Sequence, residues 1–243
     1  MKKILIILIL SVFSVANAHP FKSEKELYDY YAEIDKKIFT EKNKPIIRKK
    51  YPRKLTDKEL EQEQIPFSLK RYTVDEIVGN NKLVYNAFNY QLMSISQINE
   101  NNKEEGVIRT FDEDENLISI AYIENSKGVM GIYREYYPWG VLKNETPYYT
   151  SEINGKLKNY YPDGLLKEEY TYYNNKKEGL ATMYYESGQK FAIENYKNDL
   201  KNGDYYMYYE NGTLGMKAFF VNGKREGTIE FYEEDGKKIE KNK

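Results

Sequence analysis

The sequence of 243 residues contains no cysteine and only one histidine, His19. Without thiols, disulfides, Fe–S clusters and Cys-ligated zinc are excluded. A Ser-His-Asp triad or a multi-histidine metal centre would depend on one imidazole near the amino terminus. Lys and Arg number 37 against 38 Asp and Glu. This balance lacks the basic excess of nucleic-acid-binding proteins, so we expect no nucleic acid partner.

Motifs for catalysis and cofactor binding are also missing. The phosphate-loop pattern GxxxxGK[ST] does not occur. The acidic run Asp112 to Glu115 lacks the spaced glycine of a calcium-binding loop and is typical of a solvated turn. We therefore expect a non-enzymatic protein with no catalytic residues, no metal site and no cofactor.

Residues 1–18 have the pattern of a cleavable signal peptide. Lys2 and Lys3 precede an apolar run from Ile4 to Val15. Ala16-Asn17-Ala18 fits the small-x-small cleavage rule, with cleavage after Ala18. A membrane anchor is the alternative, but a transmembrane helix needs about 20 apolar residues. We expect an exported protein that is periplasmic, on the cell surface of a bacterium, or secreted.

Residues 19–69 form a helical and charged segment. Ser23-x-x-Glu26 is a capping box, and Leu27, Ile34 and Ile38 follow on one helical face, which predicts a helix over 23–40. Residues 36–54 hold nine basic residues and one acidic residue. This stretch is either a patch for anionic lipid or an acidic partner, or a solvated linker.

An internal repeat of about 24 residues dominates the rest of the chain. Two sets of glycines keep this spacing, and the first tyrosine of a Tyr-Tyr pair keeps it too. One glycine set is Gly131, Gly155, Gly179, Gly203 and Gly227, and the other is Gly140, Gly164, Gly188, Gly212 and Gly236. We expect both glycine sets to be structural residues of turns.

Each unit has the pattern of a β-hairpin. Tyr-rich runs such as 181–185 suit a pleated surface, and each ends in a dipeptide such as Ser187-Gly188, where glycine supplies positive φ. A second strand follows, for example 189–196, and a looser turn leads to the next unit. Because an isolated hairpin is marginally stable, successive hairpins should pair side by side.

The expected fold is mainly β: an elongated, single-layer antiparallel β-meander of hairpin repeats with a short helical segment before it. Residues 70–128 are degenerate repeats, and residues 129–243 are the clear array. Open edges of such a sheet invite pairing, so we expect a monomer or an edge-paired dimer.

The pattern K-x-E/N-G-x4-Y-Y-x-x-G-x-x, repeated at this spacing, resembles the variant MORN repeat of bacteria. The resemblance is clearest over about 129–240. It implies a single elongated antiparallel sheet used for binding rather than catalysis. Proteins with such repeats are often described as antitoxin-like. This chain departs from the family pattern because tyrosine replaces the tryptophan common in such arrays.

Tyrosines are the candidate binding residues. Because side chains alternate between faces along a strand, each Tyr-Tyr pair should place one ring on each side of the sheet. The second members, Tyr137, Tyr161, Tyr185 and Tyr209, are the candidates for an exposed aromatic surface. Trp139, the sole tryptophan, is either an exposed contact residue or a ring packed on Pro138.

Three functions remain open. We favour an exported, non-enzymatic scaffold that binds another protein through its Tyr-rich sheet surface. Direct binding of envelope lipid or glycan is the first alternative. The second is an antitoxin-like immunity protein for an exported effector.

Overall fold

A computed structural model describes residues 21–39, 73–86, 91–124 and 127–240. The leader over 1–18 and all but the first residues of the basic stretch 36–54 lie outside these ranges, so both remain predictions. Within the described residues, no helix is long and apolar enough to cross a membrane.

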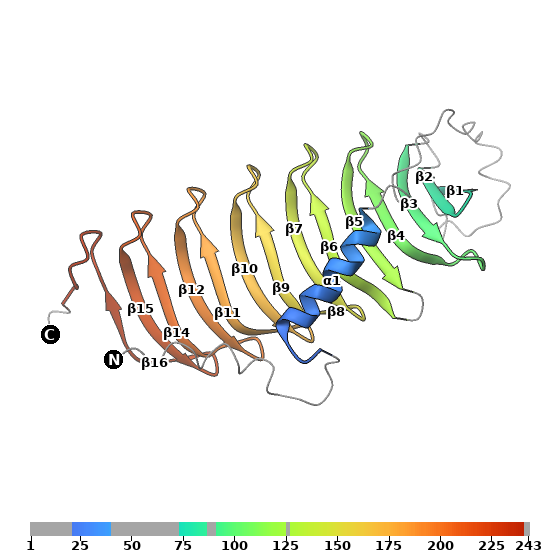
Figure 1. The fold of residues 1–243 in the computed structure, drawn as a ribbon. Helices are drawn as coiled ribbons and strands as arrows, with labels where there is room; N and C mark the ends of the chain where they lie inside the picture. Colours follow the sequence, from blue (N-terminus) through green and yellow to red (C-terminus); the bar gives the residue numbers. More distant parts are fainter. Residues whose placement is uncertain (1–20, 40–72, 87–90, 125–126, 241–243) are drawn as a thin grey trace, which may run out of the picture.

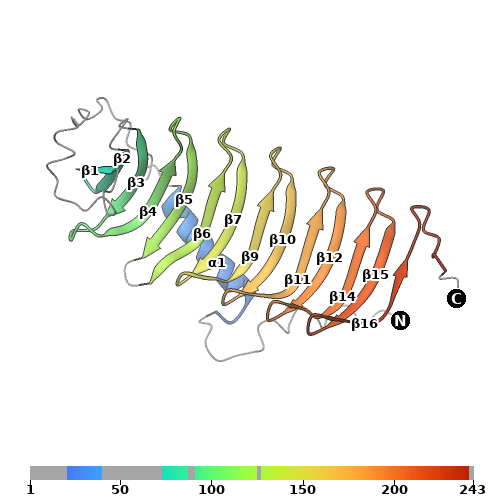
Figure 2. The same ribbon diagram turned by 180° about the vertical axis from the view of Figure 1, so that it is seen from behind.

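The described strands form one antiparallel sheet in which neighbours in sequence are neighbours in space. The order is β1-β2-β3-β4-β5-β6-β7-β9-β10-β11-β12-β14-β15-β16, with β8 on β7 and β13 on β12. Figures 1 and 2 show this sheet as a long twisted ribbon one layer thick, with α1 (Glu24–Ile38) on one face. The fold class expected from the sequence is confirmed.

The strands are short and similar in length. In the first half they are β1 (Thr73–Val78), β2 (Asn81–Asn86), β3 (Leu92–Ile98), β4 (Glu104–Phe111), β5 (Leu117–Glu124), β6 (Gly128–Tyr136), β7 (Leu142–Tyr149) and β8 (Glu152–Ile153). In the second half they are β9 (Gly155–Tyr160), β10 (Leu166–Tyr173), β11 (Lys176–Tyr184), β12 (Lys190–Lys197), β13 (Leu200–Lys201), β14 (Gly203–Tyr208), β15 (Leu214–Val221) and β16 (Lys224–Phe231).

The turn after each Tyr-Tyr pair is built as its glycine predicts. Between β11 and β12, the Tyr185 N–H donates to the Gln189 carbonyl (2.8 Å) and the Gly188 N–H donates to the Tyr185 carbonyl (2.9 Å). Gly188 has a φ of +83°. The same pair of bonds closes the turns at Gly140, Gly164, Gly212 and Gly236.

The second turn of each unit is tight, which corrects our expectation of a looser connection. Tyr173 pairs with Lys176, so only Asn174 and Asn175 lie between the strands. Both have positive φ, 46° and 64°. Two-residue turns with this backbone match the right-handed twist of the flanking strands, and asparagine tolerates the conformation.

The other glycine set lies in strands rather than in turns, which is a second correction. Gly131, Gly179 and Gly227 are inside β6, β11 and β16, and Gly155 and Gly203 begin β9 and β14. All five have positive φ. The strand pairing shifts register beside Gly131, Gly179 and Gly227, so these glycines occupy β-bulges, where an extra residue needs a backbone that glycine adopts without strain.

The single described helix forms where its capping box predicts. The Ser23 hydroxyl accepts the Glu26 N–H (3.2 Å), and the Glu26 carboxylate accepts the Lys22 N–H (2.7 Å). Leu27, Tyr31, Ile34 and Ile38 are buried. Their spacing gives the helix one apolar face, and that face lies on the sheet.

Helix α1 crosses the sheet obliquely and is held by polar bonds at both ends (Figure 1). At its start, the Tyr28 hydroxyl accepts the Lys156 N–H (2.8 Å) and the Tyr31 hydroxyl donates to the Asn154 carbonyl (2.7 Å). At its end, the Arg109 guanidinium donates to the Ile38 carbonyl (3.2 Å). A cation at a helix carboxyl end interacts favourably with the helix dipole.

An ion-pair network fixes the last turn of the helix. The Arg134 guanidinium donates to both Asp35 carboxylate oxygens (2.8 and 2.7 Å) and to Glu145 (3.2 Å). Burial lowers the pKa of Arg134, but hydrogen bonding and charge from Asp35 outweigh it, so the net shift is upward. The guanidinium therefore stays charged against the sheet.

Substitutions at two glycines with similar φ can distinguish the cost of backbone strain from the cost of disturbing the helix contact. A Cβ on Gly131 (φ +80°) would lie 2.6 Å from the Ile34 Cγ2, whereas a Cβ on Gly188 (φ +83°) meets nothing within 4 Å. We expect Gly188→Ala to cost about 1 kcal/mol through strain alone. Gly131→Ala should cost roughly 1–3 kcal/mol more and speed hydrogen exchange in α1. Equal losses in urea unfolding, with α1 equally protected, would contradict the docking contact.

Alkaline pH should loosen the helix–sheet contact. Burial raises the pKa of Tyr28 to about 12, partly opposed by the bond from Lys156. The folded state thus holds a proton that the unfolded chain loses near pH 10, so this contribution to stability is complete below pH 10 and lost between pH 10 and 12. We expect the free energy of unfolding to fall over this window, and that of the Tyr28→Phe variant to fall less steeply. If the free energy of unfolding fell equally with pH in both proteins, a contribution from Tyr28 would be excluded.

Candidate functional site

The strand pairing identifies the residues that share a face with α1. Directly opposed residues of antiparallel strands lie on the same face. A row of such residues can be followed across ten strands from Ile120 and Arg134, which contact the helix. The row is Ile120, Arg134, Glu145, Lys158, Glu169, Thr182, Ile193, Tyr206, Lys217 and Glu230.

The opposite face packs its own aromatic rings. Tyr170 and Tyr196 meet edge-to-face at 6.3 Å between centroids, and the Lys177 ammonium lies 3.8 Å from the Tyr170 centroid. The Tyr196 hydroxyl donates to Glu194, which also pairs with Lys201 (2.6 Å). Rings, acids and lysines thus satisfy one another on this face, which lets a single layer bury side chains without a second sheet.

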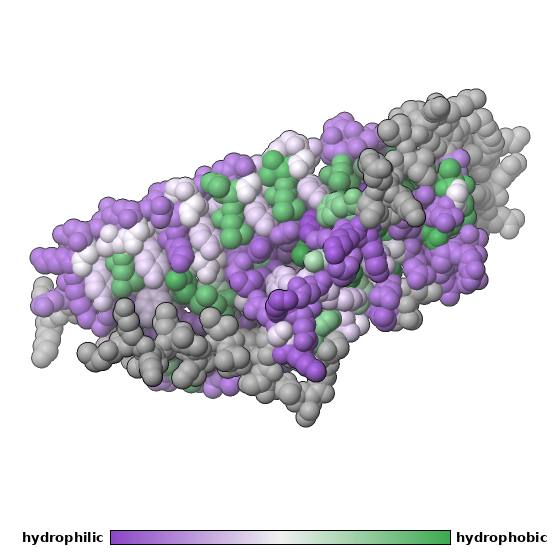
Figure 3. Space-filling model, viewed as in Figure 1, coloured by the Kyte–Doolittle hydropathy of each residue, from purple (hydrophilic) through white to green (hydrophobic). Residues whose placement is uncertain are grey.

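Among the described residues, the α1 face is covered over only part of its length. The helix contacts extend from Arg109 in β4 to Lys156 in β9, and no described element lies over the same face of β11 to β16 (Figure 1). Leu180 and Phe219, on this face by register, are 50% and 45% exposed. Figure 3 shows separate hydrophobic patches along this side, with hydrophilic residues between them. We call the surface around Leu180, Ile193, Tyr206 and Phe219 the uncovered face.

The first tyrosine of each pair lies on the α1 face. Tyr160, two residues after Lys158, donates its hydroxyl to Glu145 (2.8 Å) beside the helix contact. Burial raises its pKa, and the bond to Glu145 raises it further. Tyr184 and Tyr208 occupy the equivalent positions on the uncovered face.

The second tyrosine of each pair connects one hairpin to the next. The Tyr137 hydroxyl donates to the Tyr160 carbonyl (3.0 Å), 23 residues further along the chain. Tyr161, Tyr185 and Tyr209 repeat this bond to the carbonyls of Tyr184, Tyr208 and Tyr232 (2.7, 2.8 and 2.9 Å). We call these four bonds the tyrosine ladder. This structural role is not the one that the repeat pattern predicts for these residues, and their binding role stays a prediction.

The sequence carries a signal for the ladder. The last turn keeps its glycine and both turn bonds, but Glu233 stands where the tyrosine stood in earlier units. The tyrosine is thus lost in the turn that no described hairpin follows. Recurrence of the second tyrosine at the repeat spacing is the pattern from which a bond between units could have been inferred.

Trp139 is exposed and held in place. Its side chain is 60% exposed, its ring stacks on Tyr137 at 4.8 Å between centroids, and its indole N–H donates to the Pro162 carbonyl (3.0 Å). Of the two alternatives from the sequence, the exposed position matches the structure, and the stacking partner is Tyr137. The equivalent residue three units on, Asn211, makes the same kind of bond to Glu234 (3.0 Å).

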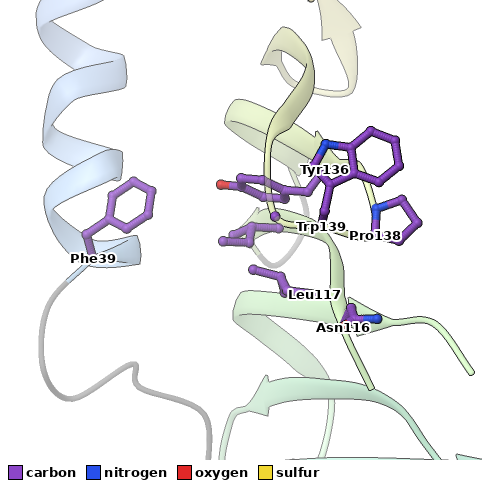
Figure 4. A pocket seen from close by; sticks show the side chains of 8 residues that line it. Phe39, Asn116, Leu117, Tyr136, Pro138 and Trp139 are labelled. Carbon is purple, nitrogen blue, oxygen red and sulfur yellow. The ribbon is translucent and has the colours of Figure 1, made fainter. Parts of the chain in front are cut away.

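An open hollow of about 480 Å³ lies between the end of α1 and this turn. Figure 4 shows Phe39 and Tyr136 facing one another across it, with Leu117 below and Trp139 and Pro138 on the sheet side. Its lining is mostly aromatic and aliphatic, with Asn116 as the polar side chain. Such a hollow can receive an apolar group.

Acidic residues form a turn rather than a cluster. Asp112 accepts the N–H groups of Asp114 (3.0 Å) and Asn116 (2.8 Å) between β4 and β5. In the described part of the chain, no group of three or more His, Asp or Glu side chains is arranged to hold a metal ion.

Three of the hairpins are similar to a known repeat family. The family model described as MORN repeat variant matches residues 153–175, 177–198 and 201–222. Each match spans one unit, ending at the tight two-residue turn. Repeats of this kind are generally motifs for interaction with proteins or membrane lipids. No curated protein matches the chain.

Removing one ladder hydroxyl should weaken the array measurably. Tyr185→Phe removes the bond to the Tyr208 carbonyl and keeps the ring, so we expect a loss of about 0.5–1.5 kcal/mol. Tyr184→Phe is the matched control, because the Tyr184 hydroxyl makes no hydrogen bond to any described residue. Urea unfolding of both variants measures the difference. Identical midpoints would show that the ladder contributes nothing.

Proposed function

We propose that this chain is an exported, non-enzymatic repeat scaffold that binds another protein through the uncovered face. The observation that carries the proposal is the contrast between the two sheet faces. One face packs its own rings, whereas the other is covered by α1 only up to β9. Beyond the helix, that face keeps large apolar side chains in contact with solvent.

The composition of the uncovered face suits a protein partner. Leu180, Ile193 and Phe219 supply apolar area, and Tyr184 and Tyr206 add rings with polar tips. Tyrosine is enriched at protein interfaces because it combines a large rigid ring with a hydroxyl. The family match supports an interaction role, which includes lipid as well as protein partners.

Export follows from the leader pattern over 1–18, and the mature chain would begin at His19. An exported scaffold without cysteine has no disulfides, so the pairing of hairpins must supply its stability. An antitoxin-like immunity role fits the same surface if the target is itself exported. Binding of anionic lipid would instead use residues 36–54 and weaken in high salt.

Affinity capture tests the proposal. Residues 19–243 are immobilised and exposed to solubilised envelope of the source organism. The double variant Leu180→Ser and Phe219→Ser removes apolar contacts from the uncovered face. Phe231→Ser is the control, because Phe231 is also exposed (36%) but pairs with Met216 on the opposite face of the sheet. We expect one protein in stoichiometric amount, retained by the control and lost with the double variant.

Other outcomes of the capture identify the alternatives. Equal recovery by all three proteins would reject the uncovered face as the binding surface. Recovery of lipid or glycan without protein would favour direct envelope binding. A membrane fraction that retains Met1 would reject export.

A further inference from the structure

The chain contains a second copy of the site on which α1 docks. At the first copy, the Asn154 N–H donates to the Pro147 carbonyl (2.9 Å), and its side-chain oxygen accepts the Asn174 N–H (3.0 Å). Two units further on, the Asn202 N–H donates to the Asn195 carbonyl (2.8 Å), and its side-chain oxygen accepts the Asn222 N–H (3.1 Å). Both asparagines interrupt the strand just before a positive-φ glycine, so the two backbones have the same form.

The first copy shows what this backbone binds. Tyr28 and Tyr31, three residues apart on α1, bond to the Lys156 N–H and the Asn154 carbonyl. Gly155 leaves room for the Tyr28 hydroxyl, which a Cβ there would approach to 3.1 Å. Helix and sheet together bury Asn154 to 1% exposure. The site therefore accepts a helix that presents two hydroxyl-bearing rings on one face.

The second copy has the same features without a described helix. Asn202 is only half-buried, and no described residue donates to its main-chain carbonyl. Gly203 stands where Gly155 stands in the first copy. A polar backbone group at a strand break is thus left for a partner or for water.

The second copy lacks the Arg–Glu pair that fixes α1 at the first copy. Arg134 and Glu145, which form the ion-pair network that fixes the helix, are replaced by Thr182 and Ile193 in the equivalent row positions. Leu180 replaces Ile132 and is exposed. An acidic residue at the position of Asp35 would find no ion-pair partner here, whereas an apolar residue there would strengthen the binding of a helix.

We propose that the second copy binds an amphipathic α-helix of a partner protein that carries two tyrosines three residues apart. At the position equivalent to Asp35, this helix carries an apolar side chain. The inference rests on the proposed function and specifies the partner. The face is continuous with the surface already occupied by α1, so the second helix would lie beside the first on the same sheet.

A peptide with the sequence of α1 tests the inference directly. The probes are labelled peptides of residues 21–39, one unmodified and one with Asp35→Leu, titrated into residues 19–243 and followed by fluorescence anisotropy. We expect saturable binding of the Asp35→Leu peptide, at least tenfold tighter than the unmodified peptide. Adding Tyr31→Phe to the peptide should weaken it severalfold, because it removes the donor for the Asn202 carbonyl.

Variants of the protein locate the bound peptide. Leu180→Asp should weaken binding at least tenfold, and Phe231→Asp, on the opposite face, should leave it unchanged. A peptide that merely replaced the resident α1 would bind equally well to the Leu180→Asp variant, so unchanged binding to this variant would overturn the inference. The absence of saturable binding, or equal affinity for the two peptides, would overturn it too. If the peptides fail but the double variant still loses the captured protein, the inference fails while the proposed function stands. If capture is also unchanged, both fail.

Discussion

Hairpin-to-hairpin contact is the interaction on which this structure depends. A sheet one layer thick has no second sheet to cover it, so each unit must find its partners in the units beside it. The tyrosine ladder adds a side-chain bond between successive units at one edge. At the other edge, the tight turns donate N–H groups to the preceding unit, for example Asn175 to Ile153. Stability then accumulates along the array as a sum of neighbour contacts.

The same constraint separates the two faces into different roles. Glu194, Lys201 and their aromatic neighbours pack one face without help from another described element. The other face needs cover, and α1 supplies it where Gly131 leaves room for Ile34 and where Arg134 binds Asp35. Beyond the helix, apolar side chains stay in contact with solvent. We therefore place the proposed interaction on that side, and the match to a family of interaction repeats supports an interaction role in general.

The turn edge around Trp139 is a separate feature of the fold. The Trp139 ring is exposed but held in one orientation, since Tyr137 stacks against one side and the Pro162 carbonyl accepts the indole N–H. The hollow between this turn and Phe39 exists because α1 ends there. The position of this aromatic surface beside the hollow depends on how the helix and two hairpins are placed against one another.

The sequence alone determined the repeat, its length, the hairpins and the cap of α1, because these follow from spacings within about 24 residues. The glycine positions indicate where the backbone adopts positive φ, and the Ser23–Glu26 pair indicates where a helix begins. Both are local features that can be read from the sequence. Contacts between distant segments were not readable. Nothing in the spacing of Gly131 shows that it receives Ile34. The recurrence of Tyr185 and its equivalents indicates a contact between units, but it does not name the Tyr208 carbonyl as the acceptor. Only the tertiary structure decided which face α1 covers and where its cover ends, because that depends on how side chains far apart in the chain fit together.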